Sequence, residues 1–564
     1  MKMKKIILIV IVSLTWVSCD SFLEETPKTS IASADFLQTE EDVNAAIYPV
    51  YKTLLLPGTF GRYWPAIDVG TDDVATNSTS GGYLGFANHT LDGSQVFFDK
   101  SLVWDTWWSG VNAANYVIDG LKSLELEASF KTNAEAEMRC MRAFFTFQLV
   151  RGWGDIPIMN YYVNSATYDK AKDETRQSID SVYTKLIIPD LIFAAENAPT
   201  VQAMTGRATK WLARTILAEV YATRAGQWRD SKTGTFKTAT VAERQNYWQL
   251  AREAAWSVVD PAVGCPNNLV TEKTTTFPNP YAQNWERNYT KESLLEVGAI
   301  GKAGLGSWLT RECWIGIDGG NFWGGTGAKP LGGTLTVNKM RFTGAPNVGS
   351  FFPRPDLFQK MEAGDFRKWG NLIRYDEGTV VYLCQPAFRK YADLRVATAK
   401  PGTSFQYGAR NFVIYRYVDA LLLFAEADNE LNGPTVDGIN AINKIRLRAG
   451  LTNLDATKTA DKDVFRTAIR TERRFELHGE CKRRFDLIRW GEFINTTKNY
   501  STAWKQTDNP KTGGGSYMTV PTFTVGAPRV EANELAHLFP IPLKELNLHK
   551  DWYDNKGYNR DFTE

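Results

Sequence analysis

The feature that most constrains the fold is a dense mixture of charged and apolar residues between Ile469 and Gly491. Large apolar residues recur there at helical spacing: Ile469, Phe475, Leu477, Phe485, Ile488 and Trp490. Arginines and carboxylates fill the positions between them, three and four residues apart, which suits bidentate ion pairs within and between helices. This pattern favours a salt-bridged helix pair near the core over an anion or substrate site, and Gly479 is expected to divide the two helices.

The order of these residues resembles a known family signature. Glu472-Arg473-Arg474, Glu476-Leu477, Glu480, Phe485-Asp486-Leu487 and Arg489-Trp490-Gly491 match the C-terminal motif of the SusD/RagB family of outer-membrane nutrient-binding lipoproteins. Cys481 departs from the pattern, because the family usually has glycine there.

Three further segments resemble the same family, in the same order. They are Arg142-Ala143-Phe144-Phe145 with Gly154-Asp155, the hairpin-like stretch 417–451, and Phe539-Pro540-Ile541-Pro542. The resemblance implies a SusD-like α-α superhelix on the cell surface. It also implies a protein, not an enzyme, that captures a glycan for a SusC-type TonB-dependent outer-membrane transporter, or a peptide as in the branch similar to RagB.

The N-terminus has the pattern of an export signal. Lysines precede a short apolar run that ends at Ser18-Cys19, and the run is too short to span a bilayer. We expect residues 1–18 to be a signal peptide and Cys19 to be lipidated, which would anchor the protein to the outer membrane. Plain signal cleavage is the alternative. Residues 19–39 then form a lipidated leader, and 40–564 a single SusD-like domain.

Helical periodicity dominates the rest of the chain and predicts a mainly α fold of tetratricopeptide-like stacked helical hairpins. In Lys210–Gly226, large and small apolar residues alternate at the spacing that packs helix on helix. Similar patterns predict helices at 40–55, 102–124, 133–151, 175–196, 242–259, 418–431 and 436–449. Trp104, Trp107 and Trp108 lie at helical spacing and are interpreted as core residues.

Composition excludes several kinds of site. The formal net charge is +2, so nothing indicates the concentrated basic surface of a nucleic-acid-binding protein. The cysteines contain no C-x-x-C pair, and the four histidines form no metal-binding i, i+4 pair. We therefore expect no metal and no cofactor, and interpret Cys140 and Cys481 as core residues.

Two long irregular regions, 57–95 and 278–350, interrupt the helical pattern and are rich in aromatic residues, among them Tyr63 and Trp308. Loops of this length are uncommon unless they have a function. Exposed Trp and Tyr rings stack on the C–H faces of sugars, while carboxylates and amides bind the hydroxyls. The predicted ligand contacts are Trp314, Trp323, Tyr289, Trp64, Tyr83, Asp72 and Asn88. For Asp72 a turn or helix-cap role is the alternative.

Three classes of function follow. The first is a surface lipoprotein that binds oligosaccharide or polysaccharide and delivers it to the transporter, with peptide binding as its variant. The second is a secreted glycoside hydrolase that uses two carboxylates, although no acid stands in a recognisable catalytic motif. The third is a helical scaffold that binds only protein.

Overall fold

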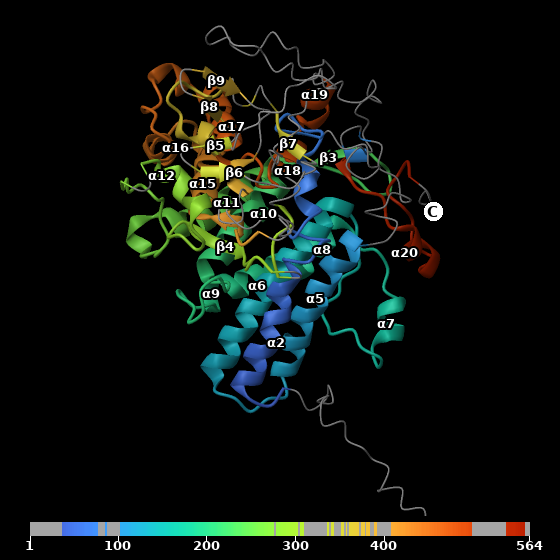
Figure 1. Ribbon diagram of the computed structural model, residues 1–564. Helices are drawn as coiled ribbons and strands as arrows, with labels where there is room; N and C mark the ends of the chain where they lie inside the picture. The colour runs from blue at the N-terminus through green and yellow to red at the C-terminus, as the bar shows by residue number, and fades with distance from the viewer. Residues whose placement is uncertain are drawn as a thin grey trace, which may run out of the picture.

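Stacked helices make up most of the structure, a computed structural model (Figure 1). It describes residues 37–76, 85–86, 89, 102–275, 278–302, 305–309, 335–337, 340–342, 351–354, 357, 360–370, 374–377, 380–383, 388–391, 408–498 and 537–558. The α-helices are α2 (Glu40–Thr53), α5 (Leu102–Leu121), α6 (Ala128–Trp153), α7 (Tyr168–Lys172), α8 (Ile179–Val182), α9 (Ile188–Asn197), α10 (Lys210–Ala225), α11 (Val241–Val259), α12 (Pro280–Glu286), α15 (Tyr417–Asn432), α16 (Val436–Arg448), α17 (Lys462–Leu477), α18 (Arg483–Arg489), α19 (Phe493–Lys498) and α20 (Leu543–Leu548).

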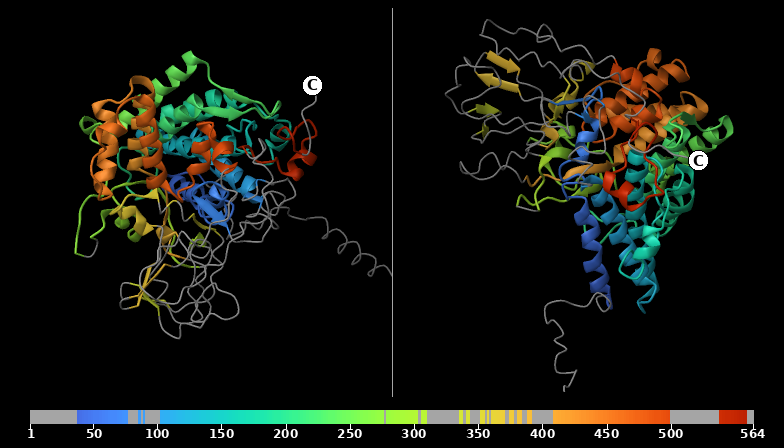
Figure 2. Two further views of the ribbon diagram at one scale, coloured as in Figure 1. Left: turned by 90° about the horizontal axis from the view of Figure 1, so that it is seen from above. Right: turned by 90° about the vertical axis from the view of Figure 1, so that its right-hand side faces the viewer.

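The long helices stack in series, each against the next: α2, α5, α6, α9, α10, α11, α15 and α16. Seen from above, the green helices and the orange helices lie side by side (Figure 2, left). Packing between neighbours along a row is the arrangement of helical repeat proteins. The mainly α, tetratricopeptide-like fold predicted from the sequence is therefore confirmed.

Local sequence explains where these helices begin. Thr39 and Asp42 form a reciprocal capping box at the start of α2, with the Asp42 N–H donating to Thr39 Oγ1 at 3.2 Å. Thr240 and Glu243 form the same box before α11. Each box satisfies backbone N–H groups that have no partner within the helix. In α10 the alternation of large and small residues buries nearly the whole helix, because its neighbours α9, α11 and α15 cover most of its surface.

Strands are short and occur in antiparallel pairs: β1 (Val74–Thr76) with β7 (Phe351–Pro353), β4 (Ser293–Val297) with β10 (Phe412–Arg416), β2 (Gln227–Arg229) with β3 (Phe236–Thr238), β5 (Leu335–Val337) with β6 (Met340–Phe342), and β8 (Arg374–Glu377) with β9 (Val380–Leu383). Figure 2 (right) shows β5, β6, β8 and β9, in yellow, to one side of the helices. Single-turn segments are η3 (Trp64–Asp68), η4 (Tyr183–Ile187, a π-helical turn), η5 (Pro261–Val263), η6 (Phe366–Gly370), η7 (Arg389–Tyr391) and η9 (Ala456–Lys458).

One predicted boundary is wrong. Residues 278–297 belong to the packed body and not to an irregular insertion, because they form α12 and β4. Tyr281 and Trp285 of α12 are buried in a small apolar cluster with Val413 of β10. The sequence of this segment is too short for helical periodicity to stand out, and pairing with β10, more than a hundred residues away, fixes the strand.

The charged stretch folds as two helices, α17 and α18, as predicted. Gly479 separates them with a φ of +72°, and a Cβ at this position would lie 2.7 Å from the Phe388 ring. Cys481 also has a left-handed backbone, with a φ of +61°, which explains why glycine suits this position in the family. Its thiol is buried, as is that of Cys140, so both cysteines are core residues as expected.

Candidate functional site

The charged motif builds a buried ion-pair network around Arg416, the last residue of β10. Arg416 Nη1 donates to Glu292 and Glu476 at 2.6 Å each, and its Nε donates to Glu480 at 2.9 Å. Arg448, at the end of α16, also donates to Glu292 at 3.0 Å. These side chains are almost completely buried. The network therefore links β10, α16, α17, the residue before β4 and the turn after α17 within the core, and it offers no surface to a ligand.

A second group of the motif joins α17 and α18 to α15. Arg473 donates to Asp486 at 2.7 Å, and Arg489 forms a bidentate pair with Glu426 at 2.6 and 2.7 Å. Burial alone would raise the pKa of Glu426, but the adjacent Arg489 lowers it to about 2. The preference for a structural role over an anion site is therefore consistent with the geometry of this stretch.

The same two helices also hold the first irregular region in place. Arg483 forms a bidentate pair with Asp72 at 2.7 Å, and Arg474 donates to Asp73 at 2.6 Å. The backbone N–H of Arg484 donates to Asp68 at 3.0 Å. The segment after η3 is thus fixed to residues more than four hundred positions later in the chain.

Burial raises the pKa of Asp68 to about 7, against the opposing hydrogen bond from the Arg484 N–H. It likewise raises the pKa of Asp73 to about 6. Above the ordinary carboxyl pKa of about 4, the unfolded chain has lost protons that the folded chain still holds. These two carboxyl groups therefore contribute most to the free energy of unfolding near the ordinary carboxyl pKa. That contribution is lost as the pH rises through their folded pKa values.

We expect the free energy of unfolding to fall between about pH 4 and about pH 7, and Asp68→Asn to make that fall shallower. The asparagine keeps an oxygen that accepts from the Arg484 N–H but does not ionise. Urea unfolding at a series of pH values measures the slope. Asp463→Asn, at an exposed carboxylate on α17, is the control, and an Asp68→Asn slope equal to that of the wild type would contradict the assignment.

Two of the predicted ligand contacts are corrected by the structure. Trp64 is 1% exposed, and its ring packs edge-on against Trp107 at 4.9 Å and stacks on Trp153 at 6.1 Å between centroids. Asp72 is 3% exposed and is paired with Arg483. Neither side chain has a surface for a sugar, because the helices cover them. Trp104 and Trp107 are core residues as expected, whereas Trp108 is half-buried.

Tyr289 is the predicted contact that lies at the surface, with 38% of the residue exposed. It has a left-handed backbone with a φ of +53°, and its N–H donates to Glu296 at 2.9 Å. Its role as a ligand contact stays a prediction. Trp314, Trp323, Tyr83 and Asn88 lie outside the described residues, as does Cys19.

The structure brings the two aromatic-rich regions together at Arg62, Tyr63 and Trp308, which we call the loop platform. The backbone N–H of Trp308 donates to the carbonyl oxygen of Gly61 at 3.2 Å. The Arg62 guanidinium carbon lies 4.8 Å from the centroid of the Tyr63 ring and 4.5 Å from that of Trp308. All three side chains are partly exposed. A cation held against two aromatic rings orients those rings, and oriented aromatic rings can stack on a ligand face.

Sequence reasoning noted Tyr63 and Trp308 as loop aromatics but not as ligand contacts, and it did not single out Arg62. The adjacent Arg62-Tyr63 pair is a signal in the sequence, since an arginine beside an aromatic residue often supports recognition. Its partner Trp308, however, is more than two hundred residues away and is found only from the folded chain.

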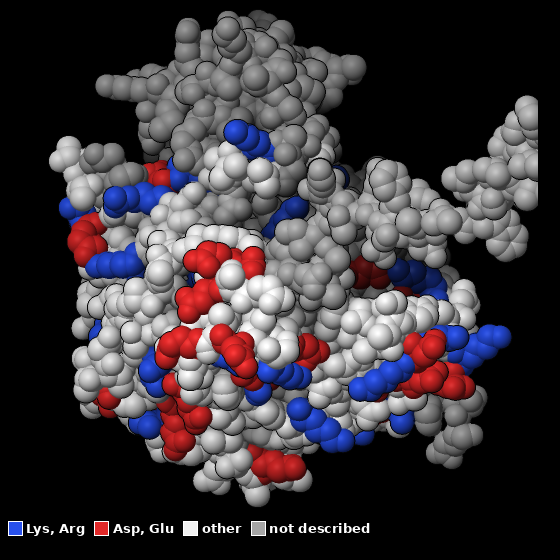
Figure 3. All heavy atoms as spheres, turned by 90° about the horizontal axis from the view of Figure 1, so that it is seen from below, with Lys and Arg blue, Asp and Glu red and all other residues white. Residues whose placement is uncertain are grey.

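On the face seen from below, acidic and basic side chains are interspersed over the described surface (Figure 3). Among the described helices, none combines the length and the hydropathy that crossing a bilayer requires. In the same part of the chain, no group of three or more His, Cys, Asp and Glu residues is arranged to hold a metal ion.

Comparisons with known proteins point to one family. A family model described as the SusD family matches residues 385–558, and one described as starch-binding associating with outer membrane matches residues 22–222. SusD-like protein P25 of Formosa agariphila is 26% identical over 530 residues, which cover 88% of this chain and 92% of that protein.

Solved structures share the fold at low identity. A SusD homologue from Bacteroides thetaiotaomicron matches with a TM-score of 0.71 and 21% identity, covering 93% of this chain and 98% of that one. A laminarin-binding SusD-like protein matches with a TM-score of 0.67 and 20% identity, covering 92% and 100%. Both likenesses describe the helical architecture and not the ligand.

Proposed function

The chain belongs to the SusD-like family, and from this premise we propose that it binds a glycan at the cell surface, with the loop platform as part of the binding site. The observation that carries the proposal is the meeting of the two aromatic-rich regions at Arg62, Tyr63 and Trp308. Laminarin binding by one structural relative supports a carbohydrate over the peptide alternative. In this proposal the protein binds and does not catalyse.

The buried ion pairs also support the proposal, because they fix the segment next to the loop platform. Arg474, Arg483 and the backbone of Arg484 hold Asp68, at the end of η3, and Asp72 and Asp73, which follow it. These residues lie a few positions after Arg62 and Tyr63. A rigid support keeps the platform in place before a ligand arrives, and such preorganisation lowers the entropic cost of binding.

The proposal includes an anchor and a partner. Cys19 would carry the lipid, and a SusC-type TonB-dependent transporter in the outer membrane would accept the glycan. The family model that links its members to the outer membrane supports this location. Pull-down of the transporter with wild-type protein and with Cys19→Ala would test whether the anchor is needed for the complex.

Trp308→Ala should weaken polysaccharide binding about tenfold or more, because it removes a stacking face and the ring against which Arg62 is held. Affinity gel electrophoresis against laminarin, starch and other polysaccharides measures the effect as loss of retardation, while thermal unfolding checks the fold.

Trp228→Ala is the matched control, since Trp228 is also partly exposed and also lies under an arginine, with the Arg224 guanidinium carbon 4.7 Å from its ring centroid. It lies on β2, outside the platform, and should leave retardation unchanged. If polysaccharide retarded the wild type and Trp308→Ala equally, the loop platform would not be part of the binding site. Peptide binding in the absence of any retardation would favour the RagB-like alternative.

A further inference from the structure

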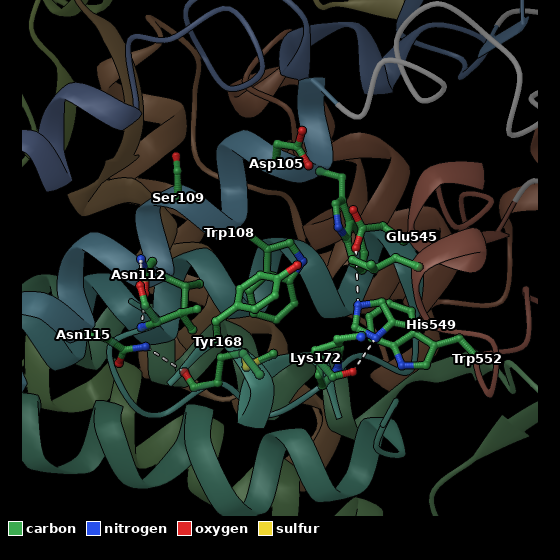
Figure 4. A pocket seen from close by; sticks show the side chains of 17 residues that line it. Asp105, Trp108, Ser109, Asn112, Asn115, Tyr168, Lys172, Glu545, His549 and Trp552 are labelled. Atoms are coloured by element: carbon green, nitrogen blue, oxygen red, sulfur yellow. Dashed lines mark hydrogen bonds and ion pairs between the residues drawn. The ribbon is translucent and has the colours of Figure 1, made fainter. Parts of the chain in front are cut away.

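A cavity of about 370 Å³ lies between α5, α7 and α20, within the part of the chain that the structure describes. Figure 4 shows Trp108 and Tyr168 in its middle, Asn112 and Asn115 towards one end, and Glu545, His549 and Trp552 at the other. Neither the loop platform nor any residue predicted from the sequence as a ligand contact lines this cavity. Its volume lies near the lower end of the range for small-molecule sites, about 300–1,000 Å³.

Most of the cavity wall is apolar and aromatic. Trp108 is half-buried and packs edge-on against Trp104, with 5.7 Å between the ring centroids. Tyr168, on the short helix α7, is 52% exposed. Pro157, Met159, Val163 and Leu548 complete this wall. A ligand that fills the cavity must therefore present an apolar face.

The amides at one end already have partners. Asn112 exchanges two hydrogen bonds with the backbone of Val163, at 2.7 and 3.2 Å. Asn115 donates to the carbonyl oxygens of Met159 and Tyr161 at 3.0 and 2.8 Å. These bonds hold the segment after α6 against α5, so the two amides shape the cavity and are not placed to recognise a ligand.

Hydrogen-bond acceptors are available at the other end. The Glu545 side chain is 16% exposed, and its carboxylate lies 3.7 Å from Lys544 Nζ and 3.9 Å from His549 Nε2. Both distances exceed hydrogen-bond length. His549 Nδ1 lies 2.9 Å from the carbonyl oxygen of Lys172, so Nδ1 carries the proton and Nε2 of the neutral ring is an acceptor. The carboxylate of Asp105, which is paired with Lys544 at 2.6 Å, is a third acceptor group.

The charges around the cavity balance. Asp105 and Glu545 are negative, while Lys172 and Lys544 are positive. A charged ligand would gain nothing from the surroundings as a whole, whereas an uncharged ligand with several hydroxyl donors matches the acceptors. An apolar face combined with hydroxyl groups is the chemistry of a pyranose ring.

We propose that this cavity is a second carbohydrate site, which binds a short neutral sugar with a ring face on Trp108 and Tyr168 and hydroxyl groups donating to Glu545 and His549. The choice of a sugar rests on the proposed glycan-binding function, but the site is separate from the loop platform.

Titration calorimetry and saturation-transfer NMR with glucose, galactose, mannose, xylose, maltose and cellobiose test the proposal. At least one probe is expected to bind the wild type, with Tyr168→Ala and Glu545→Gln each weakening it about tenfold. Tyr168 is largely exposed and Glu545→Gln keeps its shape, so both variants should fold. Tyr48→Ala, at a tyrosine of equal exposure on α2 that does not line the cavity, is the control and should bind like the wild type.

The two proposals fail in different ways. Loss of polysaccharide retardation in Trp308→Ala with unchanged binding of the small sugars is expected if both hold. Polysaccharide retardation without binding of any small sugar by the wild type would overturn the cavity proposal and leave the platform. Equal affinity of the wild type, Tyr168→Ala and Glu545→Gln for the small sugars would also overturn the cavity proposal. Binding of an aromatic peptide in place of every small sugar would overturn it as well. Small-sugar binding in the absence of polysaccharide retardation would support the cavity and overturn the platform.

Discussion

Arg416→Ala should lower the free energy of unfolding by about 3–5 kcal/mol, the usual cost of removing one partner from a buried ion-pair network. The substitution leaves Glu292, Glu476 and Glu480 in the core without the cation that they share. Arg416→Lys should also destabilise the protein, because a single ammonium group cannot donate to three carboxylates from fixed directions. Urea unfolding followed by tryptophan fluorescence measures both effects.

Lys122→Ala provides the comparison. Lys122 pairs with Asp119 on the surface, with 69% and 28% of the two side chains exposed, and its removal should cost less than about 1 kcal/mol. Arg473→Ala and Asp486→Ala, which break a second buried pair, should resemble Arg416→Ala. A variant of the network that kept wild-type stability and lost glycan binding would show that the motif contacts ligand after all.

Trp64→Ala should cost about 3–5 kcal/mol, as expected for deleting a fully buried aromatic side chain. The indole fills the space between Trp107, Trp153 and Phe539, and these rings cannot close a cavity of that size. Thermal and urea unfolding measure the loss, and affinity electrophoresis of the folded fraction should show unchanged retardation.

Trp64→Phe keeps the test informative if the alanine variant does not fold. Phenylalanine retains most of the aromatic packing and removes an indole N–H that has no hydrogen-bond acceptor among the described residues. It should destabilise the protein less than alanine does, and it should bind polysaccharide as the wild type does. Loss of glycan binding in Trp64→Phe without loss of stability would show that Trp64 contacts the ligand.

The long helices could be predicted from the sequence because the signal that forms them is local. The apolar and small residues of Lys210–Ala225 recur with the helical period, and α10 has the bounds that this pattern predicts. Glycine at 479 likewise marks the end of α17. The alternation of opposite charges in α17 and α18 indicated ion pairs, although not which distant carboxylates would join them.

The candidate site was less predictable, because the exposure of an aromatic ring depends on segments far away in the chain. Trp64 and Trp308 both stand in irregular, aromatic-rich regions. The first is enclosed by helices α5 and α6 and by Phe539. The second is held at the surface by a backbone bond to Gly61. No pattern in the sequence predicted the cavity of Trp108 and Tyr168, since the residues at its far end come from α20 and the segment after it.

The sequence by itself determined the helical scaffold, the two-helix motif and the membership of the family, since periodicity and residue order are properties of neighbouring positions. Only the tertiary structure decided that the charges of the motif hold Asp68, Asp72 and Asp73 in place, and which tryptophans meet solvent. Burial and pairing are properties of residues brought together by folding, and a linear pattern does not contain the distance between Arg62 and Trp308.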